Sequence, residues 1–420
     1  MSQASRILLS LVLGLAIGVV LAARVPVAVE PTIAVAGPVG TAWLNALQMT
    51  IIPLVVSLLV TGVAATAEAA QAGRLAARAI ALYVGFLAFS ATLAAVLTPL
   101  FLDLVPLPAA SAASLRAALT GVEQPAAAPA LGAFIAGVVP TNIVKAAVDN
   151  AFLSLIIFTL VFAFAIMRIN REGRSLLVAF FTALRDTMLV VIDWVLWIAP
   201  LGVFALALVV GAKAGGGAFG ALVHYMLTVS AVGFVMSLFA YPVAVIGGRV
   251  SLARYARAVL PSQAVAISTQ SSIGSLPAML EGARELGVPV TTAGVTLPLA
   301  VALFRATGPA MNLAVAIYVA HWFGVTLSPV VLAIGVVVAT LTSLGSVSLP
   351  GTISFVSAIA PIASVIGAPL APLGLLVAVE TVPDIMRTLG NVMWDVATTT
   401  LLHRRGGGEA LSAQEPIDDA

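Results

Sequence analysis

Apolar runs alternate with short polar segments along nearly the whole chain. A helix of about 20 apolar residues is long enough to cross a lipid bilayer. The pattern predicts eight membrane-spanning helices, at residues 7–23, 41–66, 79–103, 131–167, 176–211, 217–247, 290–324 and 371–402. The segment 104–130 is rich in alanine and proline, and we expect it to form a surface excursion with short helices.

Two further apolar stretches, 255–282 and 330–368, are interrupted near their middles by small residues and a proline. The interruptions read SSIGSLP at 271–277 and SLGSVSLPG at 343–351. Non-helical backbone at membrane depth is tolerated only where protein or a water-filled cavity covers it. We therefore expect two re-entrant helical hairpins whose tips meet inside the protein; two kinked ordinary spans are the alternative. A long helix follows each hairpin, which indicates inverted repeats with a transporter binding site at the tips.

Arginine residues concentrate at alternate ends of the predicted spans, and this pattern orients the chain in the membrane. The arginine-rich ends lie before residue 7 and at 74–78, 168–174, 249–257 and 404–405. By the positive-inside rule, these ends and both termini are predicted to be cytoplasmic. The first hairpin then enters from the cytoplasm and the second from outside. Residues 404–420 are expected to form a disordered cytoplasmic tail.

Composition supports a protein whose solvent is mostly lipid. Hydrophobic residues make up 61% of the 420 residues and charged residues 9%, whereas soluble domains carry roughly 25% charged residues. The absence of cysteine excludes disulfides and thiol chemistry, and the three histidines lack the spacing of a metal site. No nucleophile or phosphate-loop motif indicates an enzyme. A net charge of +2 gives no indication of nucleic-acid binding.

The last predicted helix carries five charged or amide residues at steps of three and four, namely Glu380, Asp384, Arg387, Asn391 and Asp395. This spacing places them on one face of a helix. Charged groups inside a membrane helix are costly and usually functional, so the face is expected to line a polar cavity. Arg387 can bind a carboxylate through two parallel hydrogen bonds, a geometry that lysine cannot offer. Structural ion pairs between two helices are the alternative.

Arg305 lies alone in the middle of the apolar helix 290–324 and needs an anionic partner. Glu380, Asp384 and Asp395 are the candidates. Arg305 and Arg387 against these three acids leave a formal excess of about one negative charge, which would suit one bound or co-transported cation.

Several segments together resemble the dicarboxylate/amino acid:cation symporter family, the glutamate transporter homologues. They are MTIIPLV at 49–55, VPTN at 139–142, APLGVF at 199–204, the two hairpin tips and the polar motif from Asp384 to Asp395. The resemblance covers nearly the whole chain. It implies an all-α integral membrane fold with eight transmembrane helices, two re-entrant hairpins as inverted repeats, an elevator mechanism and a homotrimer. Residues 1–77 and 104–216 would form the scaffold, and residues 78–103 and 217–403 the mobile transport domain.

The resemblance also implies a substrate site. Its residues would be Arg387, Asp384, Thr388, Asn391, Ser272, Gly308 and Leu349. Arg387 would bind the side-chain carboxylate of the substrate and Asp384 its amino group. Departures from the usual family pattern leave the substrate open, because Gln270 replaces an arginine, Gly308 a threonine and Ile353 a glycine.

One sodium site of the family is expected to be lost. Family members usually carry Asn-Met-Asp-Gly-Thr in the seventh helix, where this chain has FRATG at 304–308. In the third helix Tyr83 is kept, but the Thr-Ser pair that completes the same site is replaced by Phe86-Leu87. We hypothesise that the Arg305 guanidinium substitutes for this sodium ion as a tethered cation. Arg305 and Glu380 are thus the residues expected to balance charge during coupling.

Two other cation sites implied by the resemblance keep their ligand types. Na+ would bind at the carboxylate of Asp395 in one of them and at backbone carbonyls in the other. The residues concerned are Asp395, Asn391, Ala300 and Phe304, and then Ala302, Ser343, Leu344 and Ser346. Sodium coupling with fewer ions and proton coupling both stay open. The glutamate that carries the proton in some relatives aligns with Asn312, so Glu380 is the alternative proton carrier.

These observations predict a secondary active transporter in the bacterial inner membrane, a symporter of acidic amino acids or C4-dicarboxylates coupled to Na+ or H+. It would be no enzyme and would have no cofactor. Its partners would be an anionic substrate, membrane lipid and further copies of itself, and no nucleic acid. Two alternatives stay open, an obligate exchanger of anionic amino acids without ion coupling and an anion channel. Saturable uptake with counterflow separates a carrier from a channel.

Overall fold

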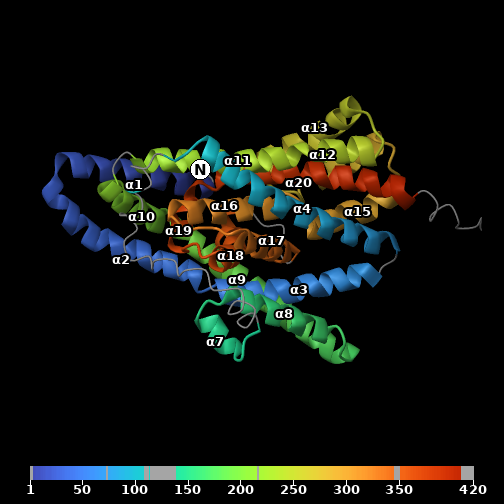
Figure 1. The fold of residues 1–420 in the computed structure, drawn as a ribbon, viewed down its shortest axis with the longest axis horizontal. Helices are drawn as coiled ribbons and strands as arrows, with labels where there is room; N and C mark the ends of the chain where they lie inside the picture. The colour runs from blue at the N-terminus through green and yellow to red at the C-terminus, as the bar shows by residue number, and fades with distance from the viewer. Residues whose placement is uncertain are drawn as a thin grey trace, which may run out of the picture.

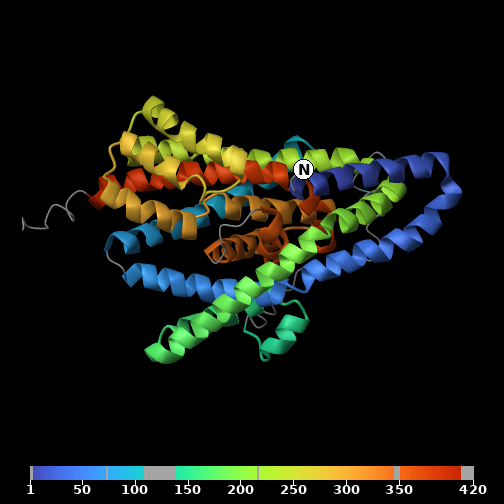
Figure 2. The ribbon, with the colours of Figure 1, turned by 180° about the vertical axis from the view of Figure 1, so that it is seen from behind.

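The computed structural model describes residues 3–71, 74–107, 113, 139–214, 217–344 and 351–407, and within these ranges all regular structure is helical. Most helices run roughly along the long axis of the molecule (Figure 1), while α9 and α10 cross one side obliquely (Figure 2). The all-α prediction is confirmed for the described residues.

The first half of the chain forms α1 (Gln3–Arg24), η1 (Pro26–Ala28), α2 (Val29–Gln48), α3 (Ile51–Gln71), α4 (Arg74–Leu104), α7 (Ile143–Val148), α8 (Phe152–Ile166), α9 (Arg171–Trp197) and α10 (Ala199–Ala214). The second half forms α11 (Gly217–Leu238), α12 (Ala240–Pro242), η2 (Val243–Gly247), α13 (Leu252–Thr269), α14 (Leu276–Glu285), α15 (Val290–Leu303), α16 (Gly308–Trp322), α17 (Pro329–Leu344), α18 (Gly351–Val365), α19 (Ala371–Leu376), η3 (Val377–Val379), α20 (Thr381–Leu402) and η4 (His403–Gly407).

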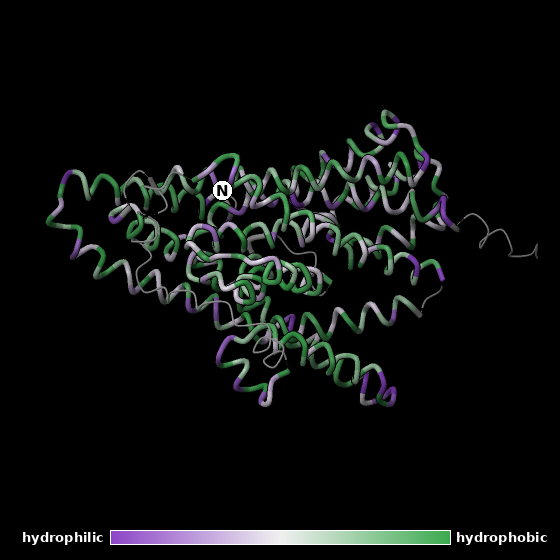
Figure 3. The backbone as a smooth tube through the Cα atoms, viewed as in Figure 1, coloured by the Kyte–Doolittle hydropathy of each residue, from purple (hydrophilic) through white to green (hydrophobic). Residues whose placement is uncertain are grey.

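Six helical stretches within the described residues are long and apolar enough to cross a membrane: Ser5–Arg24, Pro26–Ala70, Arg74–Leu104, Arg171–Trp197, Ala218–Gly247 and Val290–Trp322. Four shorter apolar helices accompany them, at Phe152–Ile166, Ala199–Lys213, Pro329–Leu344 and Ser354–Val365. Apolar residues occupy most of the length of these helices (Figure 3). The chain is therefore a multi-pass membrane protein. The predicted span 371–402 is not among the six, since Asp384, Arg387 and Asp395 lie within α20.

Five predicted spans, 41–66, 176–211, 217–247, 290–324 and 371–402, are not continuous α-helices as expected. Their breaks lie at residues 49–50, 198, 239, 304–307 and 377–380. A proline follows each break closely, namely Pro53, Pro200, Pro242, Pro309 and Pro383. Because proline has no backbone N–H, the carbonyl four residues earlier loses its helical hydrogen bond. The break at 304–307 matters most, since it carries Arg305.

The predicted span 131–167 is also wrong as one helix. The side chain of Asn142 caps α7 by accepting hydrogen bonds from the amides of Val144 (2.9 Å) and Lys145 (3.0 Å). Asn150 then adopts a left-handed conformation, with φ of 51°, before α8 begins at Phe152. Residues 131–138 and nearly all of the expected excursion at 104–130 lie outside the described residues.

The stretch predicted as the first hairpin forms two packed helices, α13 and α14, joined by residues 270–275. Gln270 ends α13 in a left-handed conformation (φ 52°). The turn is held by side chains, because Ser271 Oγ accepts from the amide of Gly274 (3.1 Å) and Ser275 Oγ donates to the carbonyl of Ser271 (2.9 Å). The two helices of the second predicted hairpin, α17 and α18, also pack together, and residues 345–350 between them lie outside the described residues.

Helix α16 forms the centre of the molecule (Figure 1), and every one of its residues except His321 is buried. It packs against α4, α11, α17 and α18, while α20 packs mainly against α11 and α13. Away from this centre, α1 packs closely against α10. A Cβ atom on Gly18 would come within 2.4 Å of the carbonyl oxygen of Leu208, so only glycine permits this approach.

The C-terminal segment 404–420, predicted to be a disordered tail, begins within the last helical turn. That turn, η4, extends from His403 to Gly407. Residues 408–420 lie outside the described residues.

Candidate functional site

The charged residues of α20 lie in the protein interior rather than against lipid. The exposed fractions are 0% for Glu380, 2% for Asp384, 5% for Arg387 and 0% for Asp395. Their spacing therefore forms the single helix face that the sequence predicted, and α20 packs against α11, α13, α15 and α16. Ions so far from water require partners, because desolvating an unpaired charge costs several kcal/mol.

Arg387 is the centre of the cluster. Its Nη1 donates to Glu380 and, at 2.9 Å, to Oδ1 of Asp384. Its Nη2 reaches the Oδ1 of Asn312 on α16 only at 3.5 Å, and its buried Nε has no hydrogen-bond partner. Tyr225 on α11 donates to the other oxygen of Glu380 at 3.4 Å. The guanidinium thus retains one edge, Nε with Nη2, whose geometry matches a carboxylate.

The break between α15 and α16 contacts α20 through Thr307. Its amide donates to Oδ1 of Asn391 (3.0 Å), and its hydroxyl lies 2.7 Å from the carbonyl of Arg387 and 2.8 Å from the same Asn391 oxygen. The Asn391 oxygen is therefore engaged, whereas its Nδ2 is buried without a hydrogen-bond partner. Asn391 presents a free donor toward the interior, which suits an anion.

Asp395 lies two turns further along α20, and neither of its carboxylate oxygens has a hydrogen-bond partner. Arg305, 9% exposed in the break before α16, interacts electrostatically with Asp395 and with Asp384. Of the three acids expected as partners of Arg305, Glu380 instead pairs with Arg387. The two arginines therefore share the acids of α20 between them.

The sequence profile of the sodium:dicarboxylate symporter family matches residues 4–405. The chain belongs to this family. It is 28% identical over 401 residues to the proton/glutamate-aspartate symporter of Escherichia coli, covering 93% of this chain and 90% of the relative. It is also 28% identical over 410 residues to the proton/sodium-glutamate symport protein of Bacillus subtilis (96% and 92%). A C4-dicarboxylate transport protein of Mesorhizobium japonicum is 26% identical over 391 residues (90% and 78%).

Membership of the symporter family makes the chain a membrane transporter and not an enzyme, as the sequence predicted. The relatives differ among themselves in the substrate and the coupling ion that their names state. The substrate and the coupling ion of this chain must therefore be inferred from its own site residues.

Several predicted site residues lie around the helix break in this symporter. Gly308 opens α16 beside Arg305, and a Cβ atom placed on it would be 3.8 Å from Oγ of Ser343 at the end of α17. Thr388 is buried and donates to the carbonyl of Asp384 at 3.0 Å. The remaining predicted residues divide by exposure: Ala300, Phe304 and Ser272 are buried, Leu344 is half-buried and Ala302 is exposed, while Ser346 and Leu349 lie outside the described residues.

Aromatic rings pack around Phe304, the residue before Arg305. The rings of Phe304 and Tyr83 stack with centroids 4.6 Å apart and an angle of 9° between their planes. Trp394 on α20 approaches Phe304 at 6.2 Å and Phe86 at 4.8 Å. The hydroxyl of Tyr83 donates to the carbonyl oxygen of Thr296 at 3.0 Å, so both the Tyr83 hydroxyl and this carbonyl already have a hydrogen-bond partner.

Two residues that contact the cluster, Thr307 and Tyr225, were not predicted from the sequence. Thr307 lies in the motif that differs from that of the family, but Arg305 is the charged residue of that motif and the one on which the prediction was based. Tyr225 is a single aromatic residue in an apolar helix, and no sequence pattern indicates its role.

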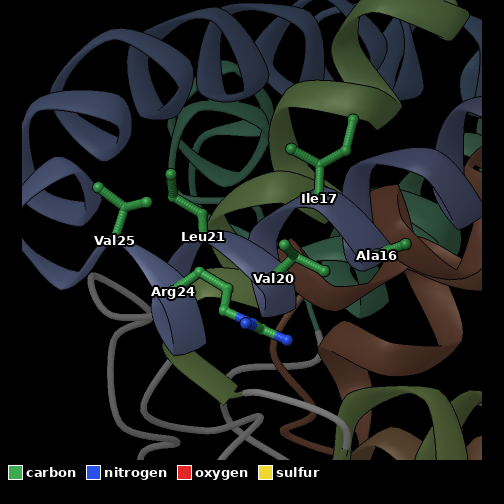
Figure 4. Close-up of a pocket in the computed structure, with 6 residues that line it drawn as sticks. All are labelled: Ala16, Ile17, Val20, Leu21, Arg24 and Val25. Carbon is green, nitrogen blue, oxygen red and sulfur yellow. The ribbon is translucent and has the colours of Figure 1, made fainter.

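A hollow of about 300 Å³ lies apart from this cluster, along α1. It is lined by Ala16, Ile17, Val20, Leu21, Arg24 and Val25 (Figure 4). None of the predicted site residues borders it.

Proposed function

We propose that this chain is a cation-coupled secondary transporter of acidic amino acids or C4-dicarboxylates. The observation that carries the proposal is the buried Arg387 guanidinium, which is anchored by acids at one nitrogen and retains a free Nε. Such an arginine fixes its own position and still offers two parallel donors to a carboxylate. The names of the relatives from Escherichia coli and Mesorhizobium japonicum point to the same substrates.

The rest of the substrate site would be formed by polar groups near Arg387. The unpartnered Nδ2 of Asn391 would donate to a second carboxylate, and Asp384 would accept an ammonium group from an amino acid. Thr388, Gly308, Ser272 and Leu349 would complete the pocket. Asn391 is better placed for this role than for binding a cation, since its oxygen already accepts from Thr307.

Charge balance supports coupling to a cation. Arg305 and Arg387 face Glu380, Asp384 and Asp395, so the cluster has one formal negative charge before any substrate binds. An incoming dicarboxylate adds two more, and uncompensated buried charge is strongly unfavourable. A sodium ion at Asp395, whose oxygens are unpartnered, or a proton at Glu380 would offset part of this charge.

We propose that the sodium sites are altered around Arg305. The tethered guanidinium would take the place of one sodium ion, because it interacts with Asp384 and Asp395 from within the helix break. The stacked rings of Phe304 and Tyr83 support this assignment, since they fill with apolar atoms a region where a cation would need oxygen ligands. Carbonyls of Ala300 and Phe304, and of Ala302, Ser343, Leu344 and Ser346, stay candidates for the remaining ions.

The architecture that we propose has eight crossings and two re-entrant hairpins, α13–α14 and α17–α18, with both termini cytoplasmic. Residues 78–103 and 217–403 would move as an elevator against the scaffold of residues 1–77 and 104–216. The close packing of α1 against α10 supports a rigid scaffold.

A homotrimer is supported by the outward surface of α9. Only Ile192, Val195 and Leu196 of its 27 residues are buried, yet Asp186 and Asp193 are exposed within this candidate membrane span. Charges facing lipid are costly, so we infer that further copies of the chain cover this helix.

Uptake of labelled aspartate, glutamate and succinate into proteoliposomes tests the proposed function. The protein should be assayed with a sodium gradient, with a proton gradient and with neither. We expect saturable uptake of at least one acid that depends on a gradient and shows counterflow. Transport of none of the three would contradict the substrate class, and gradient-independent exchange would contradict ion coupling.

A further inference from the structure

We infer that His224 is a proton-binding residue of the transport domain, connected through Tyr318 and Tyr225 to Glu380, and that it sets the pH dependence of uptake. The inference rests on the proposed function, because it concerns the charge state of the Glu380–Arg387 pair. It assigns a role to a histidine that the substrate and cation sites leave unused.

His224 lies in the second turn of α11 and joins three elements. Its Nε2 is 2.7 Å from the carbonyl oxygen of Val105, directly after α4, and its Nδ1 is 2.9 Å from the hydroxyl of Tyr318 on α16. The side chain is half-buried. It is therefore not sealed inside the protein, and both ring nitrogens have defined partners.

These partners can satisfy both protonation states of the ring. In the neutral state Nε2 donates to Val105 and Nδ1 accepts from the Tyr318 hydroxyl. In the protonated state Nδ1 donates to the Tyr318 oxygen, and the Tyr318 hydroxyl donates to the carbonyl of Ala221, 3.2 Å away. A proton can thus bind at Nδ1 with only the rotation of one hydroxyl group.

The same groups lead toward the charged cluster. The Tyr318 ring meets the ring of Tyr225 edge-on, with centroids 5.3 Å apart and an angle of 76° between the planes. Tyr225 follows His224 in the chain, and its hydroxyl donates to Glu380, which pairs with Arg387. A proton gained at His224 turns the Tyr318 hydroxyl, and the ring of Tyr318 packs against Tyr225. The surroundings of Tyr225 therefore change, and with them those of its hydrogen bond to Glu380.

The other titratable and charged groups on the elements packed against this part of α11 are few within the described residues. They are Asp103 at the end of α4, Lys213 at the end of α10, His321 on α16, and Glu380, Asp384 and Arg387 near the start of α20. Among these groups, the His224 ring lies 2.9 Å from the hydroxyl of Tyr318, whereas His321 is exposed one turn beyond Tyr318 on α16.

Uptake should be measured in proteoliposomes at external pH from about 5 to 8, the range in which histidine titrates. We expect the His224→Gln variant to lose most of the pH dependence of uptake while its substrate KM at the plateau stays within about twofold of wild type, since glutamine can donate to Val105 but cannot gain a proton. Tyr318→Phe should shift the midpoint of the profile. His321→Gln is the matched control and should leave the profile unchanged.

A profile of His224→Gln that superimposes on a pH-dependent wild type would overturn the inference, and so would a wild type without pH dependence. If no acid is transported at all, the proposed function fails instead. His224 is then followed by NMR of histidine-labelled protein in nanodiscs. We expect its ring signals to differ between the two ends of this pH range and Tyr318→Phe to change that difference; ring signals that do not differ contradict the inference.

Discussion

Helices α20 and α9 both carry charged residues within apolar sequence, but they place them in different surroundings. On α20 the side chains of Glu380 and Arg387 are 0% and 6% exposed, and they are paired with each other inside the protein. On α9, Asp186 is 58% exposed and pairs with its neighbour Arg185, at 2.7 Å. We propose two roles for charged residues in the membrane helices of this molecule: a ligand site where they face inward, and an interface with a second copy of the chain where they face outward.

Experiments can test whether the charges of the two helices have these different roles. Removing a charge from α20 or from the break that faces it should alter transport or its ion dependence. Removing one from α9 should alter assembly and leave the substrate affinity nearly unchanged.

The largest effect is expected for Asp384→Asn. If this carboxylate accepts the ammonium group of an amino acid, the variant loses about 100-fold in kcat/KM for aspartate, as a lost charge pair of roughly 3 kcal/mol would give. Uptake of succinate, which has no ammonium group, should change much less. Glu281→Gln, at an exposed ion pair on α14, is the control. Equal losses for both substrates would assign Asp384 to holding Arg387 only.

Arg305→Met should change the ion dependence rather than only the rate. Without the tethered guanidinium, Asp384 and Asp395 lose a positive charge, so we expect uptake to require about one further cation and its sodium dependence to become steeper. Arg305→Lys keeps the charge and should resemble wild type more closely. The test is the rate of substrate uptake measured as a function of sodium concentration. An unchanged rate and an unchanged sodium dependence in Arg305→Met would contradict the hypothesis that Arg305 acts as a tethered cation.

A smaller effect is expected for Asp186→Asn on α9. If a neighbouring copy covers this acid, the variant should weaken the oligomer about tenfold, or ~1.4 kcal/mol. The oligomeric state in detergent can be followed by mass photometry during dilution. Glu172→Gln, in the exposed first turn of the same helix, is the control. An oligomer of unchanged stability, or a monomeric wild type, would contradict the assigned role of α9.

The last prediction concerns the uncharged contact of α1 with α10, where we expect an effect on stability and none on transport specificity. Gly18→Ala places a methyl group 2.4 Å from the Leu208 carbonyl oxygen, and such overpacking costs about 1–3 kcal/mol. We expect Gly18→Ala to lower the Tm. Gly37→Ala should leave the Tm unchanged, because a Cβ atom there would meet nothing within 4 Å. Equal Tm values for the two variants would show that this contact is not tight.

The sequence predicted the buried face of α20 because helical periodicity alone puts residues 380, 384, 387, 391 and 395 in line. It could not predict which acid pairs with which arginine. That depends on how α11 and α16 pack. In the structure Arg387 pairs with both Glu380 and Asp384, while Arg305 interacts electrostatically with Asp384 and Asp395. Hydropathy likewise located the helices but hid their breaks, because a proline such as Pro309 interrupts the hydrogen bonds of a helix without interrupting its apolar pattern.

Equilibrium binding to the protein in nanodiscs tests most directly whether the α20 cluster is an anion site centred on Arg387. Calorimetry should compare aspartate, succinate and the neutral amide asparagine on wild type and on Arg387→Gln, with Arg284→Gln, an exposed arginine, as the control. We expect wild type and the control to bind at least one acid and not asparagine, and Arg387→Gln to lose that binding. Binding of the acid by Arg387→Gln with wild-type affinity would contradict the account.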